Sequence, residues 1–131
     1  THDQSSAASD VYKRQVTAGK GYVANRMKSD VSGGTAIMSH MAIGSGTTNP
    51  AAGDTAPETQ LARVALTSTG ISGAVLTYTA TFGAGTGTGA VTEAAILNAS
   101  SGGTMLCRTE FSVVNKGSAD SMTITWTVTV S

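Results

Sequence analysis

Charged residues are scarce in this chain, and few of its side chains are of the kinds that most often carry out chemistry. Charged residues make up 12% of the sequence and aromatic residues 5%, and the formal net charge is +0 at pH 7. A nucleic-acid-binding surface needs a basic patch that displaces counterions from phosphates, so this composition argues against nucleic acid as a partner. No apolar run approaches the roughly 20 residues of a membrane-spanning helix, so we expect no membrane partner either.

Cysteine and histidine are almost absent as well. Cys107 is the only cysteine, which excludes an intrachain disulfide and a thiolate metal cluster. It lies inside a strand pattern, where we expect a small core residue. His40 is the only histidine outside residues 1–15, which are set aside below. It has no Gly-x-Ser-x-Gly motif beside it, and one histidine with one distant cysteine cannot supply the ligands of a zinc site. We expect His40 to be a half-buried strand residue, and we predict no catalytic, cofactor-binding or metal-binding residue, no cofactor and no enzymatic activity.

The beginning of the chain has an unusual origin. Residues 5–15 resemble, codon by codon, the translation of a transposase sequencing adapter, and residues 1–4 fit the bases that precede it. We therefore expect residues 1–15 to be an adapter-derived artefact that is disordered, as a cloning scar would be. Residues 16–131 are then expected to form a single domain. The gene would come from a fragmentary metagenomic assembly, with native residues before Val16 missing.

The clearest pattern in the sequence is at residues 121–130. Its even positions are all apolar, and its odd positions are all serine or threonine. A period of two places one face of a strand against a core and the other face in water. We expect Trp126 near the centre of the packing, on a core face that comprises Met122, Ile124, Trp126, Val128 and Val130.

Similar runs recur along the chain between Gly-, Ser- and Asn-rich turns. We expect further strands at residues 35–43, 61–68, 74–82, 90–99 and 104–114. A short helix is expected at residues 18–27, a helical turn at 57–60, and turns at 30–34 and 69–70. Together these segments predict an all-β fold, an antiparallel β-sandwich of the jelly-roll or immunoglobulin-like kind with one short N-terminal helix.

The polar residues of the second half give weak signals. Residues 83–89 alternate glycine with alanine and threonine but lack the helix and the lysine of a phosphate-binding loop, so we expect a loop between strands. Glu93 and Glu110 lie on separate predicted strands, with nothing to place them together, and we expect Glu93 to be a solvent-facing or interface charge. Arg108 and Glu110 are expected to be exposed neighbours. Met105, Cys107, Phe111 and Val113 are expected to share one face of their strand.

Two parts of the chain resemble small structural proteins of tailed bacteriophages. The first part ends a strand with Ile43-Gly44-Ser45-Gly46-Thr47, continues through a Pro/Ala/Asp-Thr loop at residues 50–55, and resumes with a Glu-x-x-x-Ala-Arg segment at residues 58–63. The second part comprises residues 92–99, 103–109, 114–116 and 123–127. It departs mildly from the pattern at residues 94–97, where Ala-Ala-Ile-Leu replaces Ala-Gly-Leu-Phe.

The resemblance implies a function but supplies no catalytic residues. Such proteins are described as tail-fibre-like, tail-collar-like or other virion components. We therefore expect a non-enzymatic virion structural protein, associated with the tail or a tail fibre, that acts by assembly. Its partners would be other virion proteins and further copies of itself, and its location would be the virion, assembled in the cytoplasm of the bacterial host. The alternatives are a capsid decoration protein and a fibre module that binds a receptor or a host-surface glycan.

Overall fold

The computed structural model describes residues 12–27 and 36–130, and these residues form eight strands and one helix. The elements are, in chain order, β1 (Tyr12–Gln15), α1 (Thr17–Met27), β2 (His40–Gly44), β3 (Gln60–Ala65), β4 (Ser68–Ser72), β5 (Val75–Phe82), β6 (Gly89–Leu97), β7 (Met105–Lys116) and β8 (Met122–Thr129).

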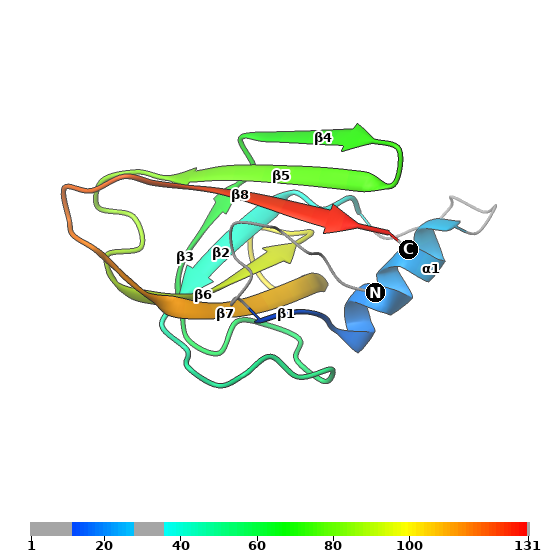
Figure 1. Cartoon of the computed structure of the whole chain (residues 1–131), viewed down its shortest axis with the longest axis horizontal. Helices are drawn as coiled ribbons and strands as arrows, with labels where there is room; N and C mark the ends of the chain where they lie inside the picture. The colour runs from blue at the N-terminus through cyan, green and yellow to red at the C-terminus, as the bar shows by residue number, and fades with distance from the viewer. Residues whose placement is uncertain (1–11, 28–35, 131) are drawn as a thin grey trace.

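The strands form two sheets that pack against each other (Figure 1). In the described part of the chain, a large sheet has the order β1-β7-β6-β2-β3 and a small sheet has the order β4-β5-β8. Every paired strand runs antiparallel to its neighbour. The expected all-β sandwich with one short helix is therefore confirmed.

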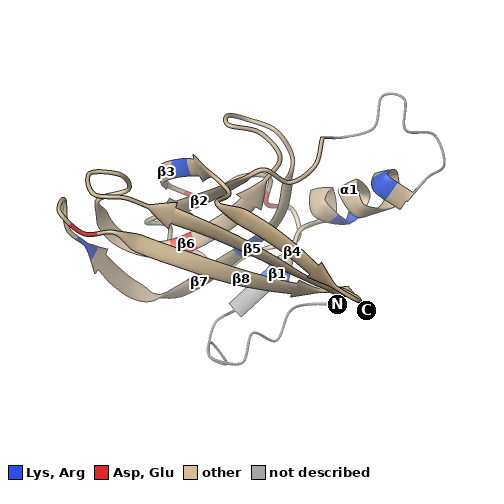
Figure 2. Cartoon of the chain, turned by 90° about the horizontal axis from the view of Figure 1, so that it is seen from above, with Lys and Arg blue, Asp and Glu red and all other residues tan. Residues whose placement is uncertain are grey.

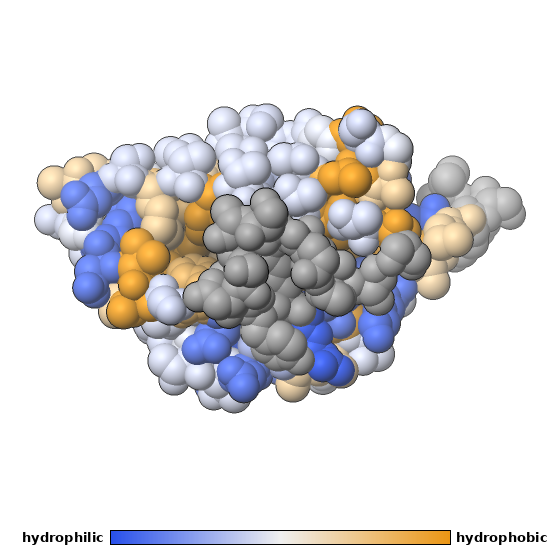
Figure 3. Space-filling view, in the orientation of Figure 1, coloured by the Kyte–Doolittle hydropathy of each residue, from blue (hydrophilic) through white to orange (hydrophobic). Residues whose placement is uncertain are grey.

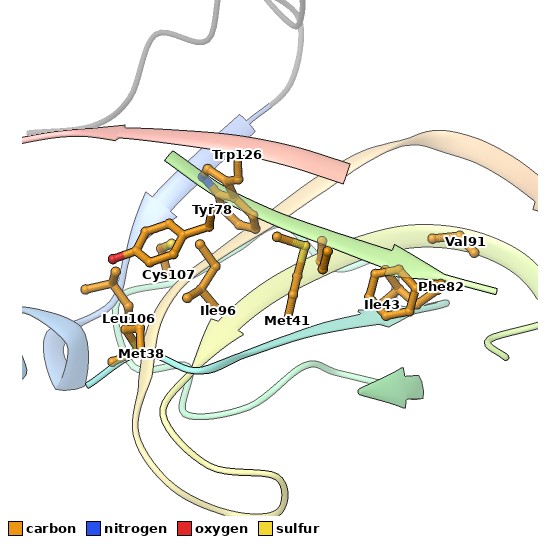
Figure 4. Packing of buried hydrophobic residues seen from close by; sticks show 12 residues of the cluster. Met38, Met41, Ile43, Tyr78, Phe82, Val91, Ile96, Leu106, Cys107 and Trp126 are labelled. Atoms are coloured by element: carbon orange, nitrogen blue, oxygen red, sulfur yellow. The ribbon is translucent and has the colours of Figure 1, made fainter. Parts of the chain in front are cut away.

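The main core lies between the two sheets (Figure 4). Trp126 of β8 is only 3% exposed and lies directly opposite Tyr78 of β5 in the register of the small sheet. Met41 and Ile96 face them from β2 and β6 of the large sheet. The alternation in residues 121–130 therefore predicted the core face correctly, except that Val130 follows the end of β8 and is 51% exposed.

A second, smaller apolar cluster is separate from the main core. Its fully buried members are Val16, Ala42, Ala95, Leu97 and Met105. Neighbouring strand residues point to opposite faces of a sheet, and Ala42 and Ala95 lie between residues of the main core, so this cluster lies on the outer face of the large sheet. The large sheet is thus buried on both faces around these residues.

A β-bulge separates two residues that were expected to share a face. The pairing of β6 with β7 shifts between Ile96, which lies opposite Cys107, and Leu97, which lies opposite Met105. Leu106 is the extra residue of β7 at this point, and an extra residue reverses the alternation of faces. Cys107 consequently points into the main core, where Phe111 also packs, whereas Met105 points into the outer cluster. Val113, expected on the same face, is 54% exposed.

Helix α1 packs against β7, and a glycine permits its close approach. A Cβ on Gly19 would lie 2.7 Å from the carbonyl carbon of Leu106, closer than side chains are found to backbone. Gly19 therefore costs some intrinsic helix propensity but allows Tyr22 and Val23 to reach the main core. The expected helix at residues 18–27 is confirmed, with one further residue at its start.

Part of the segment that was expected to be disordered, Tyr12–Gln15, is a strand in the structure. These residues form β1, which pairs with β7 from Tyr12 opposite Glu110 to Gln15 opposite Cys107. The open edge of β7 offers backbone N–H and C=O groups that pair with an extended chain largely irrespective of its side chains. Residues 1–11, the expected turn at 30–34 and the first residue of the expected strand at 35–43 lie outside the described residues.

Three further boundaries differ from the expectations. The strand expected from residue 35 begins at His40. The helical turn expected at residues 57–60 is absent from the structure, which is irregular there until β3 begins at Gln60. Thr69 and Gly70, expected in a turn, lie in β4 because they pair with Tyr78 and Thr77 of β5.

Candidate functional site

Two charged side chains are buried on the outer face of the large sheet. Glu93 of β6 is 0% exposed and Arg108 of β7 is 2% exposed. In the register of these strands Arg108 lies opposite Ala95, two residues from Glu93, so both side chains project from the same face. Burying either charge alone would cost several kcal/mol, so their partners decide whether the arrangement is stable.

The carboxylate of Glu93 accepts four hydrogen bonds. Its Oε2 accepts the backbone N–H of Gly46 at 2.8 Å and that of Thr59 at 2.8 Å. Its Oε1 accepts the backbone N–H of Glu58 at 2.9 Å and the Nε–H of Arg108 at 2.8 Å. One buried side chain thus joins the two ends of the loop at residues 45–59 to the large sheet.

Arg108 connects Glu93 to two further carboxylates. Its Nη1 donates to Asp54 Oδ2 at 3.0 Å, and its Nη2 lies 4.0 Å from Glu58 Oε1. Nη2 is buried and makes no hydrogen bond with the described residues. The carboxylates of Glu93, Asp54 and Glu58 therefore surround one guanidinium group.

The carboxylates of Asp54 and Glu58 also shape the loop itself. Asp54 Oδ2 accepts the N–H of Ala51 at 3.0 Å. Glu58 Oε1 accepts the N–H groups of Thr47 at 2.8 Å and Thr48 at 3.0 Å, and Glu58 Oε2 accepts the hydroxyl of Thr48. Glu93, Arg108, Asp54 and Glu58 together are called the loop clamp below.

Gly46 and Thr92 complete this arrangement. A Cβ on Gly46 would lie 2.6 Å from Glu58 Oε1 and closer still to Glu93 Oε2, so only glycine fits between the two carboxylates. The hydroxyl of Thr92 donates to the carbonyl oxygen of Gly46 at 2.6 Å. Thr92 reaches the loop at the irregularity in β6 between Val91 and Glu93.

The hydrogen bonds outweigh the effect of burial on the ionisation of Glu93. Burial acts to raise the pKa of its carboxyl, but the N–H of Thr59, the guanidinium of Arg108 and the N–H groups of Glu58 and Gly46 lower that pKa overall. Burial likewise acts to lower the pKa of Arg108, and Glu93 and Asp54 raise it overall. The hydroxyl and N–H of Thr48 lower the pKa of Glu58. Glu93, Arg108 and Glu58 are therefore charged at neutral pH.

The geometry of the loop clamp suits a structural role better than a chemical one. All four hydrogen bonds of Glu93 come from the protein, and its carboxylate is closed to solvent. A general base needs a free lone pair within reach of a substrate proton, which this carboxylate lacks. Among the described residues, no group of three or more His, Cys, Asp and Glu side chains could hold a metal ion.

The expectations for these charged residues were wrong. Glu93 was expected to face solvent or an interface and Arg108 to be exposed, but both are buried. Nothing in the sequence placed Glu93 and Glu110 together, whereas the register of β6 and β7 places them directly opposite each other. The available signal was a charge next to apolar residues in each of two strands, Glu93 before residues 94–97 and Arg108 after residues 105–107. A charge in such a place must find partners if the strand is buried on both faces.

The remaining predicted residues lie as expected. His40 is half-buried in β2, with its Nδ1 2.8 Å from the hydroxyl of Ser39. Cys107 is buried in the main core. Residues 83–89 connect β5 to the start of β6 and precede no helix. The prediction that no residue is catalytic or binds a cofactor or metal stays a prediction.

Lys116 is a second buried cation that the sequence did not reveal. It is 3% exposed at the end of β7, and its Nζ donates to the carbonyl oxygens of Gly83 at 2.8 Å and Asp120 at 2.7 Å. The carboxylate of Asp120 in turn accepts the N–H of Gly117 at 2.7 Å. Lys116 therefore joins the turn between β7 and β8 to the loop that follows β5.

No protein-family model matches this chain, and neither curated proteins nor solved structures show a significant similarity to it. In the described parts of the chain, no helix has both the length and the apolar character needed to cross a membrane.

Proposed function

We propose that this protein is a non-enzymatic structural component of a bacteriophage virion, associated with the tail or a tail fibre, and that it acts by assembly. The observation that carries the proposal is where the phage-like residues lie. Gly46, Asp54 and Glu58 of the first phage-like part contact Glu93 and Arg108 of the second part in the loop clamp. The two parts of the chain that resemble phage proteins therefore contact each other and together hold the loop at residues 45–59. Such contacts are expected if the resemblance reflects a shared scaffold.

The surface composition also supports a role in assembly. None of β4, β5 and β8 contains a charged residue, so the small sheet lacks the charges that keep sheets apart in solution (Figure 2). Pale surface of intermediate hydropathy covers most of the upper rim in Figure 3, where β4 and β5 lie, and a hydrophobic patch in orange lies at its right end. A virion protein that is surrounded by neighbours tolerates such a surface.

The two alternatives are supported less well. A glycan-binding fibre module would present aromatic side chains to a sugar, but Tyr78, Phe82 and Trp126 are buried, and Tyr22 and Phe111 pack against the main core. A capsid decoration protein would use the same scaffold, and we favour the tail on the resemblance to tail-fibre-like and tail-collar-like proteins. The virion would be assembled in the cytoplasm of the bacterial host.

Gene neighbourhood on an intact contig provides the direct test, because head genes and tail genes cluster separately in phage genomes. We expect tail or fibre genes beside the coding sequence. Neighbouring capsid and portal genes would favour the decoration role, and neighbouring metabolic genes would overturn the proposal. The protein should then be co-expressed with the neighbouring gene products and should co-sediment with the structures that they form. The Arg108→Ala variant, co-expressed and sedimented in the same way, tests whether the shape of the loop at residues 45–59 is needed for this co-sedimentation.

A further inference from the structure

The open edges of the two sheets differ in their protection against pairing with another chain. Within the described residues, the edge strands are β1 and β3 of the large sheet and β4 and β8 of the small sheet. An edge strand presents unpaired backbone N–H and C=O groups, and proteins commonly protect it with charge, with a short length or with an irregularity. β1 carries Arg14, β3 carries Arg63 beside a register shift, and β4 is short and contains Gly70.

β8 has none of these protections. It is a strand of 8 residues without a charged residue, a proline or a glycine. Its register with β5 is continuous from Met122 opposite Phe82 to Thr129 opposite Val75. Figure 2 shows β8 as an uncharged strand along its whole length at the border of the small sheet. A long, regular, uncharged edge is a template for strand pairing.

The hydrogen bonds of the small sheet show which backbone groups of β8 point to the open edge. The N–H of Val130 donates to the carbonyl oxygen of Ala74 at 2.9 Å, so the backbone of Val130 faces β5. Alternate residues of an antiparallel strand bond to the same neighbour, so Trp126 and Val128 also face β5. The N–H and C=O groups that point outward are therefore those of the threonines between them: Thr123, Thr125, Thr127 and Thr129.

We propose that β8 pairs with β8 of a second copy of this chain, antiparallel and about a two-fold axis that passes beside Trp126. In this register Thr125 of each copy lies opposite Thr127 of the other, and Thr123 lies opposite Thr129. All four outward threonines then form backbone hydrogen bonds, about eight in total. The two small sheets merge into one continuous sheet.

The chemistry of the small sheet favours a second copy over a different partner. Self-pairing about a two-fold axis brings identical residues close together, so a charge on the strand would repel its own copy. The small sheet has no charged residue that would do so. The paired strands would also align threonine side chains on the outer face. This contact already exists within one copy, where the hydroxyls of Thr81 on β5 and Thr123 on β8 lie 2.9 Å apart.

The pairing of β8 names one partner in the proposed assembly and the strand that contacts it. The biological purpose of this pairing rests on the proposed function. The two ideas fail separately. Gene neighbourhood and co-sedimentation test the virion role, whereas the state of association of the purified chain tests the pairing of β8.

Sedimentation equilibrium of the purified full chain, over about a hundredfold range of concentration that reaches several hundred micromolar, measures the association. We expect a monomer–dimer equilibrium. Thr127→Pro removes one outward N–H and leaves the bonds to β5 intact, so it should weaken dimerisation about tenfold or more. Thr127→Val keeps that N–H and should dimerise like the original chain.

Two lysine variants keep the test decisive if the proline variant does not fold. Thr127→Lys places two like charges close together across the axis and should abolish the dimer, whereas Thr69→Lys on β4 should leave it unchanged. Circular dichroism verifies that each variant is folded. A chain that stays monomeric throughout, or a dimer that is as stable in folded Thr127→Pro and Thr127→Lys as in the original chain, would overturn the proposal.

Discussion

The inner face of the large sheet is covered by a second sheet, whereas its outer face is covered around Glu93 by a loop. On the inner side, Met41 and Ile96 pack against aromatic and aliphatic residues of the small sheet. On the outer side, a small apolar cluster lies beside the loop clamp, which holds residues 45–59 by hydrogen bonds and ion pairs. The same strands thus bury one face by apolar contact and part of the other face by charge.

The two faces differ in how they respond to change. Apolar packing is a sum of many weak contacts, so a substitution that conserves volume retains most of them. A buried ion pair contributes little net stability while it is intact, because desolvation offsets attraction. The loss of one member leaves the other buried and unpaired, at a cost of several kcal/mol. The loop clamp should therefore be the part of the domain that is most sensitive to a conservative substitution.

Among conservative substitutions, Glu93→Gln should have the largest effect, a loss of about 3–5 kcal/mol in the free energy of unfolding. The substitution keeps the size of the side chain but removes the negative charge that pairs with Arg108. Its amide NH₂ also faces N–H donors and cannot accept hydrogen bonds from them. Urea unfolding followed by circular dichroism measures the loss.

Ile96→Leu is the matched substitution on the inner face of the same strand. It also conserves volume, in a fully buried position, and should cost less than about 1.5 kcal/mol. Equal losses in the two variants would contradict the distinction between the faces.

Trp126→Ala tests how much a large deletion costs on the inner face. We expect a loss of about 3–5 kcal/mol, because the substitution leaves a cavity between the sheets. Urea unfolding gives the value, and Val130→Ala serves as the control because Val130 is mostly exposed. A loss below about 1 kcal/mol for Trp126→Ala would mean that this tryptophan does not contribute to the core.

Acid should have a smaller and graded effect through Glu93. Hydrogen bonds lower the pKa of Glu93 in the folded state below its ordinary value of 4.5. Its contribution to stability is therefore complete above that value and is lost as the pH falls through the lower pKa of the folded state. Urea unfolding at a series of pH values should show this decline, and Glu93→Gln should flatten it. An equal decline in that variant would assign the acid sensitivity to other groups.

Much of the sandwich could be predicted because its strands alternate regularly. The faces of β5 and β8 follow directly from a period of two, and so does the burial of Trp126. Strand β4 was missed because Thr69 and Gly70 are common turn residues, and their pairing with β5 overrides that preference. The pairing of β1 was missed because the edge of β7 forms hydrogen bonds with backbone groups, which almost any sequence provides.

The loop clamp could not be predicted from spacing alone. Glu93 and Arg108 are distant from Asp54 in the sequence, and only the register of β6 with β7 and the return of the loop bring them together. Bulges add to the difficulty, because Leu106 reverses the faces of Met105 and Cys107 in a way that no periodic pattern reveals. The motif at residues 43–63 included several of the residues involved but gave no indication of their contacts.

The four hydrogen bonds to Glu93 have a consequence for the motions of the loop. Loop amides usually exchange their hydrogens with water quickly, because small local openings expose them. The N–H groups of Gly46, Glu58 and Thr59 are instead bonded to a carboxylate that is buried within the sheet, and the N–H of Thr17 at the start of α1 donates to Ala52 of the same loop at 2.8 Å. These amides should therefore exchange as slowly as those of the central strands, and the loop, the start of the helix and the large sheet should open as one cooperative unit.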